Sequence, residues 1–192
     1  MTNYYLLEAD NYIDYGVIDN PEIDDDPSFL NGKLITGPIP LLIFEVNFPK
    51  DEKLPHFLGN QFPLVSKAFL HALQLAGVDN FQQFPARLVN SQTGQSWDDF
   101  VAFNVIGFVK AANLDHSDFD VLMAGSDDDK VPPLLAFREI ALDKNKIPST
   151  AMMFRMAEDP CNVIIHEHVV AVLSTHKPNS GWGVDVIEVD MI

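Results

Sequence analysis

The chain of 192 residues is 47% apolar and 21% charged, the size and composition of one globular domain, here residues 1–192. Its 12 basic and 28 acidic residues give a net charge of −16. That surplus argues against nucleic-acid binding, which needs Lys and Arg to neutralise phosphates. It favours a partner with a basic surface, although an acidic surface also serves solubility.

The compartment is predicted from the cysteine content and from the lengths of the apolar runs. The single cysteine, Cys161, excludes an internal disulfide and is typical of a reducing compartment. The first eight residues lack the basic region and long apolar stretch of a signal peptide. The longest apolar runs, such as residues 38–44, fall far short of the ~20 residues that span a bilayer. We therefore expect a soluble cytoplasmic protein without membrane association.

The first elements expected along the chain are two strands separated by an acidic segment. Residues 3–7 are predicted to form a short strand, and residues 19–27 are too polar and too rich in proline to form an element. Residues 39–48 are rich in Ile, Leu, Phe and Val and have prolines at their margins. Because proline cannot donate to a ladder, this strand is expected near a sheet edge.

The clearest helix signal covers Ser66 to Ala76. Ser66 is a favourable N-cap, and apolar residues then recur at helical spacing on one face. Gly77 follows at the position where helices commonly end in a left-handed residue. The sequence therefore predicts a helix with both ends defined.

The rest of the chain is predicted to consist mainly of strands. Residues 81–89, interrupted by Pro85, and residues 100–109 are expected to form a hairpin through the turn at 90–94. Further strands are expected at residues 134–142, 152–156 and 183–190. Residues 164–176 are rich in β-branched side chains, which favours a strand. However, their apolar positions match those of the first helix 100 residues earlier, and this match favours a second helix.

These elements together predict an α+β fold. We expect a single domain of short, mostly antiparallel strands with two or more amphipathic helices. The similarity between the two helical segments suggests a pseudo-repeat of helix–strand units.

Several short motifs resemble a known family. They are, in chain order, Pro-Leu-Val-Ser at 63–66, Ala-Leu at 72–73, Ala-Gly-Val-Asp-Asn at 76–80, Phe-Pro at 84–85, Phe-Asn-Val-Ile-Gly at 103–107 and Ala-Met-Met-Phe-Arg-Met-Ala-Glu at 151–158. In this order and spacing, over about residues 4–190, they resemble a bacterial immunity-protein family of polymorphic toxin systems. The resemblance implies an α+β architecture, no cofactor and action by binding a toxin. The residues of the family pattern with structural roles are Ser66, Gly77, Asn104, Phe154, Arg155 and Glu158.

Two positions depart from the family pattern. His56 stands where Asp is expected, and His166 stands where the second helix is expected to start with Ser. Neither departure affects the predicted fold, but both bear on whether the family's partner is shared.

The candidate catalytic and metal-binding residues do not fit the chemistry they suggest. His166 and His168 are two residues apart, which on a helix points their side chains about 200° apart, whereas a zinc-protease helix needs a spacing of four. Cys161 follows Asp159 and Pro160, neighbours that raise rather than lower a thiol pKa. We therefore predict no catalytic residue, no metal and no cofactor.

Two acidic triplets are the candidate partner-binding residues: Asp24, Asp25 and Asp26, and Asp127, Asp128 and Asp129. Neither has the alternating spacing of a calcium loop. They are expected to be solvated loops or contacts for basic residues of a toxin. Arg155 and Glu158 would face opposite ways on a strand, and Arg155 is expected to form a buried ion pair that joins two sheet segments.

The sequence thus predicts a non-enzymatic immunity protein that binds and neutralises a cognate bacterial toxin. Two alternatives stay open. One is an enzyme that acts on a small molecule in a pocket of His and Asp residues from distant segments, and the other is a structural subunit of a larger assembly.

Overall fold

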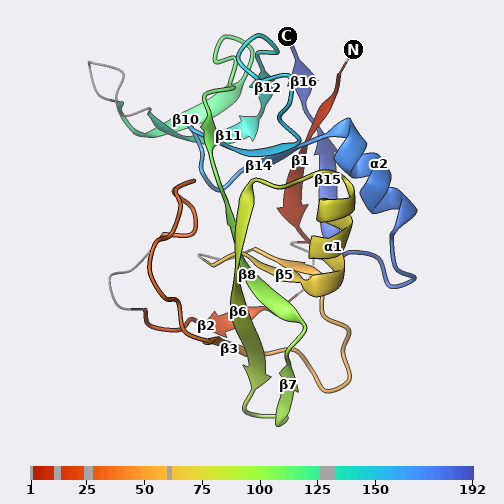
Figure 1. The fold of residues 1–192 in the computed structure, drawn as a ribbon. Coiled ribbons are helices and arrows are strands. Elements are labelled where there is room, and N and C mark those ends of the chain that lie inside the picture. The colour runs from red at the N-terminus through yellow and green to blue at the C-terminus, as the bar shows by residue number, and fades with distance from the viewer. Residues whose placement is uncertain (1, 11–13, 24–27, 60–61, 126–132) are drawn as a thin grey trace.

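The computed structural model describes residues 2–10, 14–23, 28–59, 62–125 and 133–192. Two curled sheets form most of the molecule, and the two helices lie side by side on one flank (Figure 1). About 40% of the structure is strand and 10% is helix. Among the described residues, no helix is long and apolar enough to cross a membrane.

The larger sheet comes from the first half of the chain. In spatial order its strands are β2 (Val17–Asp19), β3 (Leu42–Val46), β6 (Phe81–Asn90), β8 (Phe100–Val105), β5 (Leu64–Ser66) and β4 (Phe57–Leu58), with β7 (Gln95–Trp97) paired to β6. The strand predicted near an edge, β3, lies second from the edge and is parallel to β6.

The smaller sheet combines the N-terminus with the second half of the chain. Its order is β15 (Val184–Glu188), β1 (Tyr4–Ala9), β14 (Val163–His166), β13 (Met153–Met156) and β9 (Phe108–Val109). Two ribbons lie beside it: antiparallel β10 (Asp118–Met123) with β11 (Leu134–Glu139), and parallel β12 (Ala141–Leu142) with β16 (Asp190–Met191).

The predicted α+β class is wrong, because the protein is mostly β. The helices α1 (Lys67–Leu75) and α2 (Glu167–Thr175) have nine residues each and are the only helices in the described parts of the chain. The apolar segments between turns are short and rich in Phe and β-branched residues, and nearly all of them pair in sheets. Even the segment predicted as a second helix begins as strand β14, whose Ile164 and Ile165 are buried in the sheet.

The predicted first helix is present with the expected ends. The Phe69 N–H donates to the Ser66 hydroxyl oxygen at 3.1 Å, so Ser66 satisfies one of the free donors at the helix start. Gly77 follows the helix with a φ of +79°, a conformation that costs a residue with a Cβ about 1–2 kcal/mol. This element is specified by residues within the segment itself.

The two strand–helix segments have the same local topology in their sheets. α1 joins β5 to β6, which flank the antiparallel strand β8, and α2 joins β14 to β15, which flank the antiparallel strand β1. At the start of α2 the His166 ring takes the place of a serine, because its Nδ1 accepts from the His168 N–H at 2.9 Å. The similarity seen in the sequence thus corresponds to two similar units, whose short helices leave the fold mostly β.

Pro85 does not interrupt strand β6 but lies where the strand changes partners. Residues 81–85 pair with β8, and residues 86–90 pair with β3 and β7. A residue without an N–H is tolerated there because the ladder of hydrogen bonds is being exchanged. The hairpin turn after β6 is held by the Asn90 side-chain oxygen, which accepts from the N–H groups of Gln92 and Thr93 at 2.9 Å each.

One apolar cluster is shared by both sheets and both helices. Phe69 and Leu73 of α1 meet Val169 and Leu173 of α2. Further members come from the strands of each sheet: Val65, Val101, Val105, Met153, Val163 and Ile165. The two sheets therefore share this cluster, and each sheet also has a buried apolar cluster of its own.

Candidate functional site

Four of the predicted family-pattern residues have structural roles. Ser66 caps α1, and Gly77 ends it. The Asn104 amide donates to the Lys33 carbonyl at 2.9 Å, and Phe154 packs edge-on against a tyrosine of β1. Ser66, Asn104 and Phe154 are buried, so they stabilise the fold and present no chemistry to solvent. The acidic triplets Asp24–Asp26 and Asp127–Asp129 lie outside the described residues.

Several of the sequence motifs meet at the junction of the two sheets. The Asn80 amide donates to the carbonyls of Ile106 and Met153, both at 2.9 Å. These three residues belong to the Ala-Gly-Val-Asp-Asn, Asn-Val-Ile-Gly and Met-Met-Phe motifs. The motifs therefore share one structural task, which is to join the end of α1 to both sheets.

Arg155 is the most unusual buried residue of the molecule. It lies on β13 and is only 1% exposed, and its Nη1 donates to the Pro160 carbonyl at 2.7 Å. Among the described residues, its Nε and Nη2 have no hydrogen-bond partner. The ion pair predicted for Arg155 is not found among the described residues. Burial lowers the pKa of the guanidinium to about 10, partly offset by Cys161.

A cavity of about 370 Å³ lies against Arg155 where the two sheets meet. Its apolar walls come from strands β1, β4 and β14 and from the loop before β5: Leu7, Phe57, Pro63 and Val163. Glu8, Cys161 and Asn162 supply its polar lining. The cavity therefore has mixed apolar and polar walls, and the buried Arg155 is one of its lining residues.

The turn beside this cavity is held by Asp159. Its carboxylate accepts from the Cys161 N–H at 3.2 Å and from the Asn162 amide at 3.1 Å. Burial raises the pKa of the Cys161 thiol, Asp159 raises it further, and Arg155 lowers it. The thiol is thus protonated near neutral pH, which does not suit a nucleophile.

Glu158 is buried at 2% exposure and does not pair with Arg155. One of its carboxylate oxygens accepts from the Ala112 N–H at 3.3 Å, and the other has no partner in the described parts of the chain. Burial raises the pKa of this carboxyl, while the hydrogen bond from Ala112 and the charges of Lys146 and Lys110 lower it. The sequence placed Glu158 in a motif but gave no signal of its burial, which depends on segments more than 40 residues away.

Replacing Glu158 by Gln tests the cost of its buried charge. Because the folded pKa is raised, the folded state holds a proton that the unfolded state has released, and stability falls as pH rises through the folded pKa. Glu158→Gln is expected to stabilise the protein by about 1–3 kcal/mol at pH 8 and to have little effect at pH 4. Urea unfolding at both pH values measures this difference. The exposed Glu139→Gln is the control, and an equal change for both variants at pH 8 would refute the interpretation.

A serine and a histidine form the most enzyme-like pair. The His56 Nδ1 lies 2.7 Å from the Ser66 hydroxyl, as in a serine nucleophile with its base. However, Ser66 is buried, and its hydroxyl already accepts from the Phe69 N–H. The His56 ring packs edge-on against Trp182, and burial lowers its pKa despite the opposing charge of Asp99. The pair is therefore an extended helix cap, and His56 bonds the capping hydroxyl from the position where the family pattern has Asp.

His166 at the start of α2 makes contacts within the protein. The His166 ring nitrogen is used by the His168 N–H, and the ring lies edge-on to Tyr4. In the part of the chain that the structure describes, no group of three His, Cys, Asp or Glu side chains is placed to hold a metal ion.

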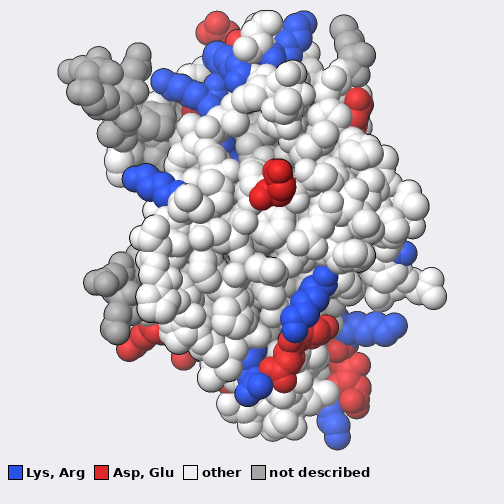
Figure 2. Space-filling view, viewed as in Figure 1, with Lys and Arg blue, Asp and Glu red and all other residues white. Residues whose placement is uncertain are grey.

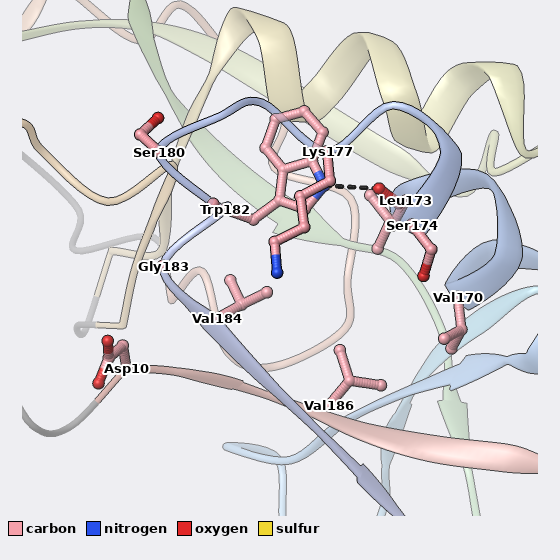
Figure 3. A pocket seen from close by; sticks show the side chains of 11 residues that line it. Asp10, Val170, Leu173, Ser174, Lys177, Ser180, Trp182, Gly183, Val184 and Val186 are labelled. Atoms are coloured by element: carbon pink, nitrogen blue, oxygen red, sulfur yellow. Dashed lines mark hydrogen bonds between the residues drawn. The ribbon is translucent and has the colours of Figure 1, made fainter.

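A second cavity, of about 410 Å³, lies between α2 and the edge strand β15. Figure 3 shows the Lys177 side chain extending over it, with Val184 and Val186 of β15 on the side away from the helix. Trp182 closes one side, and its indole N–H donates to the Leu173 carbonyl at 2.8 Å. This cavity offers valine side chains and one exposed amine, and its lining contains no His, Cys or Glu.

Charge is unevenly distributed over the surface. On the face shown in Figure 2, charged side chains gather at the two ends, and the middle is mostly uncharged. The acidic surplus of the sequence therefore does not cover this face. No protein-family model matches the chain, and no curated protein matches it either. The resemblance to immunity proteins accordingly depends on the motifs alone.

Proposed function

We propose that this protein is a non-enzymatic immunity protein that binds a cognate bacterial toxin and neutralises it by covering a functional surface. The observation that carries the proposal is an exposed apolar stretch on strand β10. Val121, Leu122 and Met123 are 60%, 64% and 60% exposed. Contiguous exposed apolar residues of this kind are typical of protein-interaction sites.

The ribbon that carries this stretch stands apart from the two large sheets. β10 and β11 pair only with each other among the described strands, and they project from one side of the molecule (Figure 1). On β11, Arg138 bonds the carboxylate of Asp118 at 2.6 and 2.8 Å and also reaches Asp120. These bonds tie the two strands together. A ribbon held in one conformation loses less entropy when it binds a partner.

The net charge supports a basic partner surface. With −16 overall, the protein would attract a basic toxin during encounter, and salt would slow association because screening at 0.15 M shortens the field to about 8 Å. The apolar stretch would then supply the buried contact, as in other interfaces with an apolar centre and a polar rim.

The proposal is tested by co-expression with the product of any toxin gene that lies adjacent to this protein's gene. Leu122→Asp is expected to abolish growth rescue and co-purification, because a carboxylate cannot be buried unpaired in an interface. Leu34→Asp is the matched control, since Leu34 is also 64% exposed but lies outside the ribbon, and it should rescue like the wild type. Both variants should melt at the wild-type temperature.

The possible outcomes distinguish a failure of the immunity role from a failure of the proposed contact surface on β10. If Leu122→Asp still protects, the ribbon is not the contact surface. If the wild type neither rescues growth nor co-purifies with the toxin, the immunity role is excluded.

A further inference from the structure

We propose that the free edge of strand β15 binds an extended basic segment of a partner protein, which adds one strand to the smaller sheet. The side chains of this segment alternate, with apolar ones on the α2 side of the sheet and basic ones on the opposite face. The inference is independent of the toxin-binding role, since it uses neither the β10–β11 ribbon nor a toxin.

The hydrogen bonds between β15 and β1 leave alternate backbone groups of β15 unused. The Asp10 N–H donates to the Gly183 carbonyl, and the Val189 N–H donates to the Tyr4 carbonyl, both at 3.3 Å. In the antiparallel register that connects these two pairs, the odd-numbered residues of β15 bond to β1. The N–H and C=O groups of its even-numbered residues therefore face away from β1. Among the described residues, no strand pairs with that side.

β15 is also the longest terminal strand of the two large sheets. It pairs with β1 over five residues without an irregularity, and it contains no proline or lysine. At the other ends of the sheets, β9 and β4 have two residues each, and β2 has three in an irregular register. Short and bulged strands are common means of preventing an edge from pairing with another chain. Val186 and Ile187 point to opposite faces and are 37% and 47% exposed, so both faces of β15 are open to solvent there.

On the α2 side, this edge offers a cavity for an uncharged side chain. Val184 and Val186 line the cavity of about 410 Å³ between β15 and α2, and Val170 of the helix lines it too (Figure 3). The charged residues of the described lining, Asp10 and Lys177, have opposite signs. The residues of an added strand that lie opposite Val184 and Val186 are therefore expected to be apolar.

On the opposite face, the edge carries unpaired negative charge. Asp185 lies directly opposite Glu8 of β1, and like charges in this arrangement are destabilising. Neither carboxylate has an ion pair or hydrogen bond among the described residues. A cavity of about 520 Å³ on this face adds Glu139 and Asp190, while its basic lining residue, Arg138, is already bonded to aspartates of β10. A basic side chain placed beside Asp185 would relieve the repulsion.

A second copy of this chain does not fit the same edge. It would bring Asp185 and Glu188 of its own β15 against this strand, and each copy has a net charge of −16. Like charges on neighbouring strands destabilise the pairing, whereas basic side chains are attracted to it. Main-chain hydrogen bonds require an extended backbone, and alternate side chains then decide which sequence binds. Charge complementarity thus selects a basic extended segment over self-association.

The binding test measures fluorescence anisotropy of a labelled, acetylated and amidated peptide, Lys-Val-Lys-Val-Lys, with the whole protein at constant ionic strength. It should bind in a saturable way. Lys-Lys-Val-Val-Lys has the same composition but places lysines on both faces of a strand. The first peptide N-methylated at its valines keeps every charge but loses the N–H groups that donate to β15. Each control peptide should bind about tenfold more weakly or worse, the cost of one or more lost hydrogen bonds.

Val186→Pro locates the binding at the backbone of the edge. The Val186 N–H faces away from β1, so proline removes a donor to the peptide and spares the ladder with β1. Proline is tolerated on edge strands for this reason. The variant should bind the alternating peptide about tenfold more weakly. A melting temperature close to that of the wild type checks that β15 still pairs with β1.

Asp185→Lys tests the charge on the other face and covers the case in which Val186→Pro fails to fold. It places opposite charges on Glu8 and residue 185, so the fold is retained. The lysine peptide should bind about tenfold more weakly, and the peptide Glu-Val-Glu-Val-Glu should bind more tightly than it binds to the wild type. Glu22→Lys is the matched control. Glu22 is exposed and follows β2 of the larger sheet, so this variant makes the same change in net charge without affecting the edge.

Three results would overturn the proposal. The first is equal binding of the alternating and the N-methylated peptides, which would indicate attraction between opposite charges only. The second is equal weakening by Asp185→Lys and Glu22→Lys, or no binding to the wild type at all. The third is a dimer of the wild type in sedimentation that Val186→Pro converts to a monomer, since a second copy would then occupy the edge. None of these measurements involves a toxin, so their failure leaves the immunity role to its own test.

Discussion

Phe69→Ala is expected to lower the free energy of unfolding by about 3–5 kcal/mol, the usual cost of removing a fully buried aromatic ring. The Phe69 ring is completely buried on α1, 6.2 Å from the ring of Phe57 and 5.2 Å from that of Trp182. These two neighbours come from β4 and from the loop before β15. Its loss would therefore leave a void between segments of both halves of the chain.

This substitution also tests whether the chain unfolds as one domain. Because the cluster around Phe69 includes residues of both sheets, the variant should show a single transition displaced to lower urea, with fluorescence and circular dichroism changing together. Leu75→Ala on the same helix is the control, since Leu75 is 50% exposed and should cost much less. Two separate transitions, only one of them displaced, would show that the halves fold independently.

Gly183→Ala is expected to destabilise the protein by about 2–5 kcal/mol. Gly183 has a φ of +66°, which costs an alanine about 1–2 kcal/mol. A Cβ built there would also lie 2.3 Å from the Cβ of Pro55 and 2.8 Å from its Cα, and such overpacking adds about 1–3 kcal/mol. The Pro55 segment cannot easily move away, because the His56 N–H donates to the Trp182 carbonyl at 2.8 Å.

Gly94→Ala separates the two contributions to this effect. Gly94 has a similar φ of +73° but nothing within 4 Å of the added Cβ, so only the conformational cost of about 1–2 kcal/mol remains. Thermal or urea unfolding of both variants gives the comparison. Equal destabilisation would mean that the contact with Pro55 relaxes without cost.

Features specified by neighbouring residues could be predicted from the sequence. The helix after Ser66 is set by its cap, its apolar spacing and Gly77, all within twelve residues, and the structure has it where expected. The hairpin after β6 is likewise set by the turn chemistry of Asn90 and Gly94. In these elements, local hydrogen bonds and backbone strain favour one conformation over its competitors. Both depend only on residues that are close together in the sequence.

The candidate site could not be predicted to the same extent. The sequence singled out Arg155 and Glu158 but predicted an ion pair for Arg155, whereas the structure leaves two of its nitrogens unpaired. The cavity beside it is lined by Leu7, Phe57 and Val163, residues that no motif connects. Whether a charged side chain is paired depends on which distant segments pack around it, and periodicity carries no information about that.

The sequence by itself determined the local elements: the capped helix α1, the turns and most of the strands. The tertiary structure alone decided where the second helix begins, since β14 is a strand because Ile165 pairs with Tyr5 on one side and Met153 on the other. Residues 164–176 are compatible with a helix by spacing, and β-branched side chains add only a weak preference against it. Pairing in the sheet lets Ile164 and Ile165 be completely buried, which outweighs that small local difference. In this segment, contacts between residues about 160 apart in the chain keep residues 163–166 in a strand, so that the helix that follows has only nine residues.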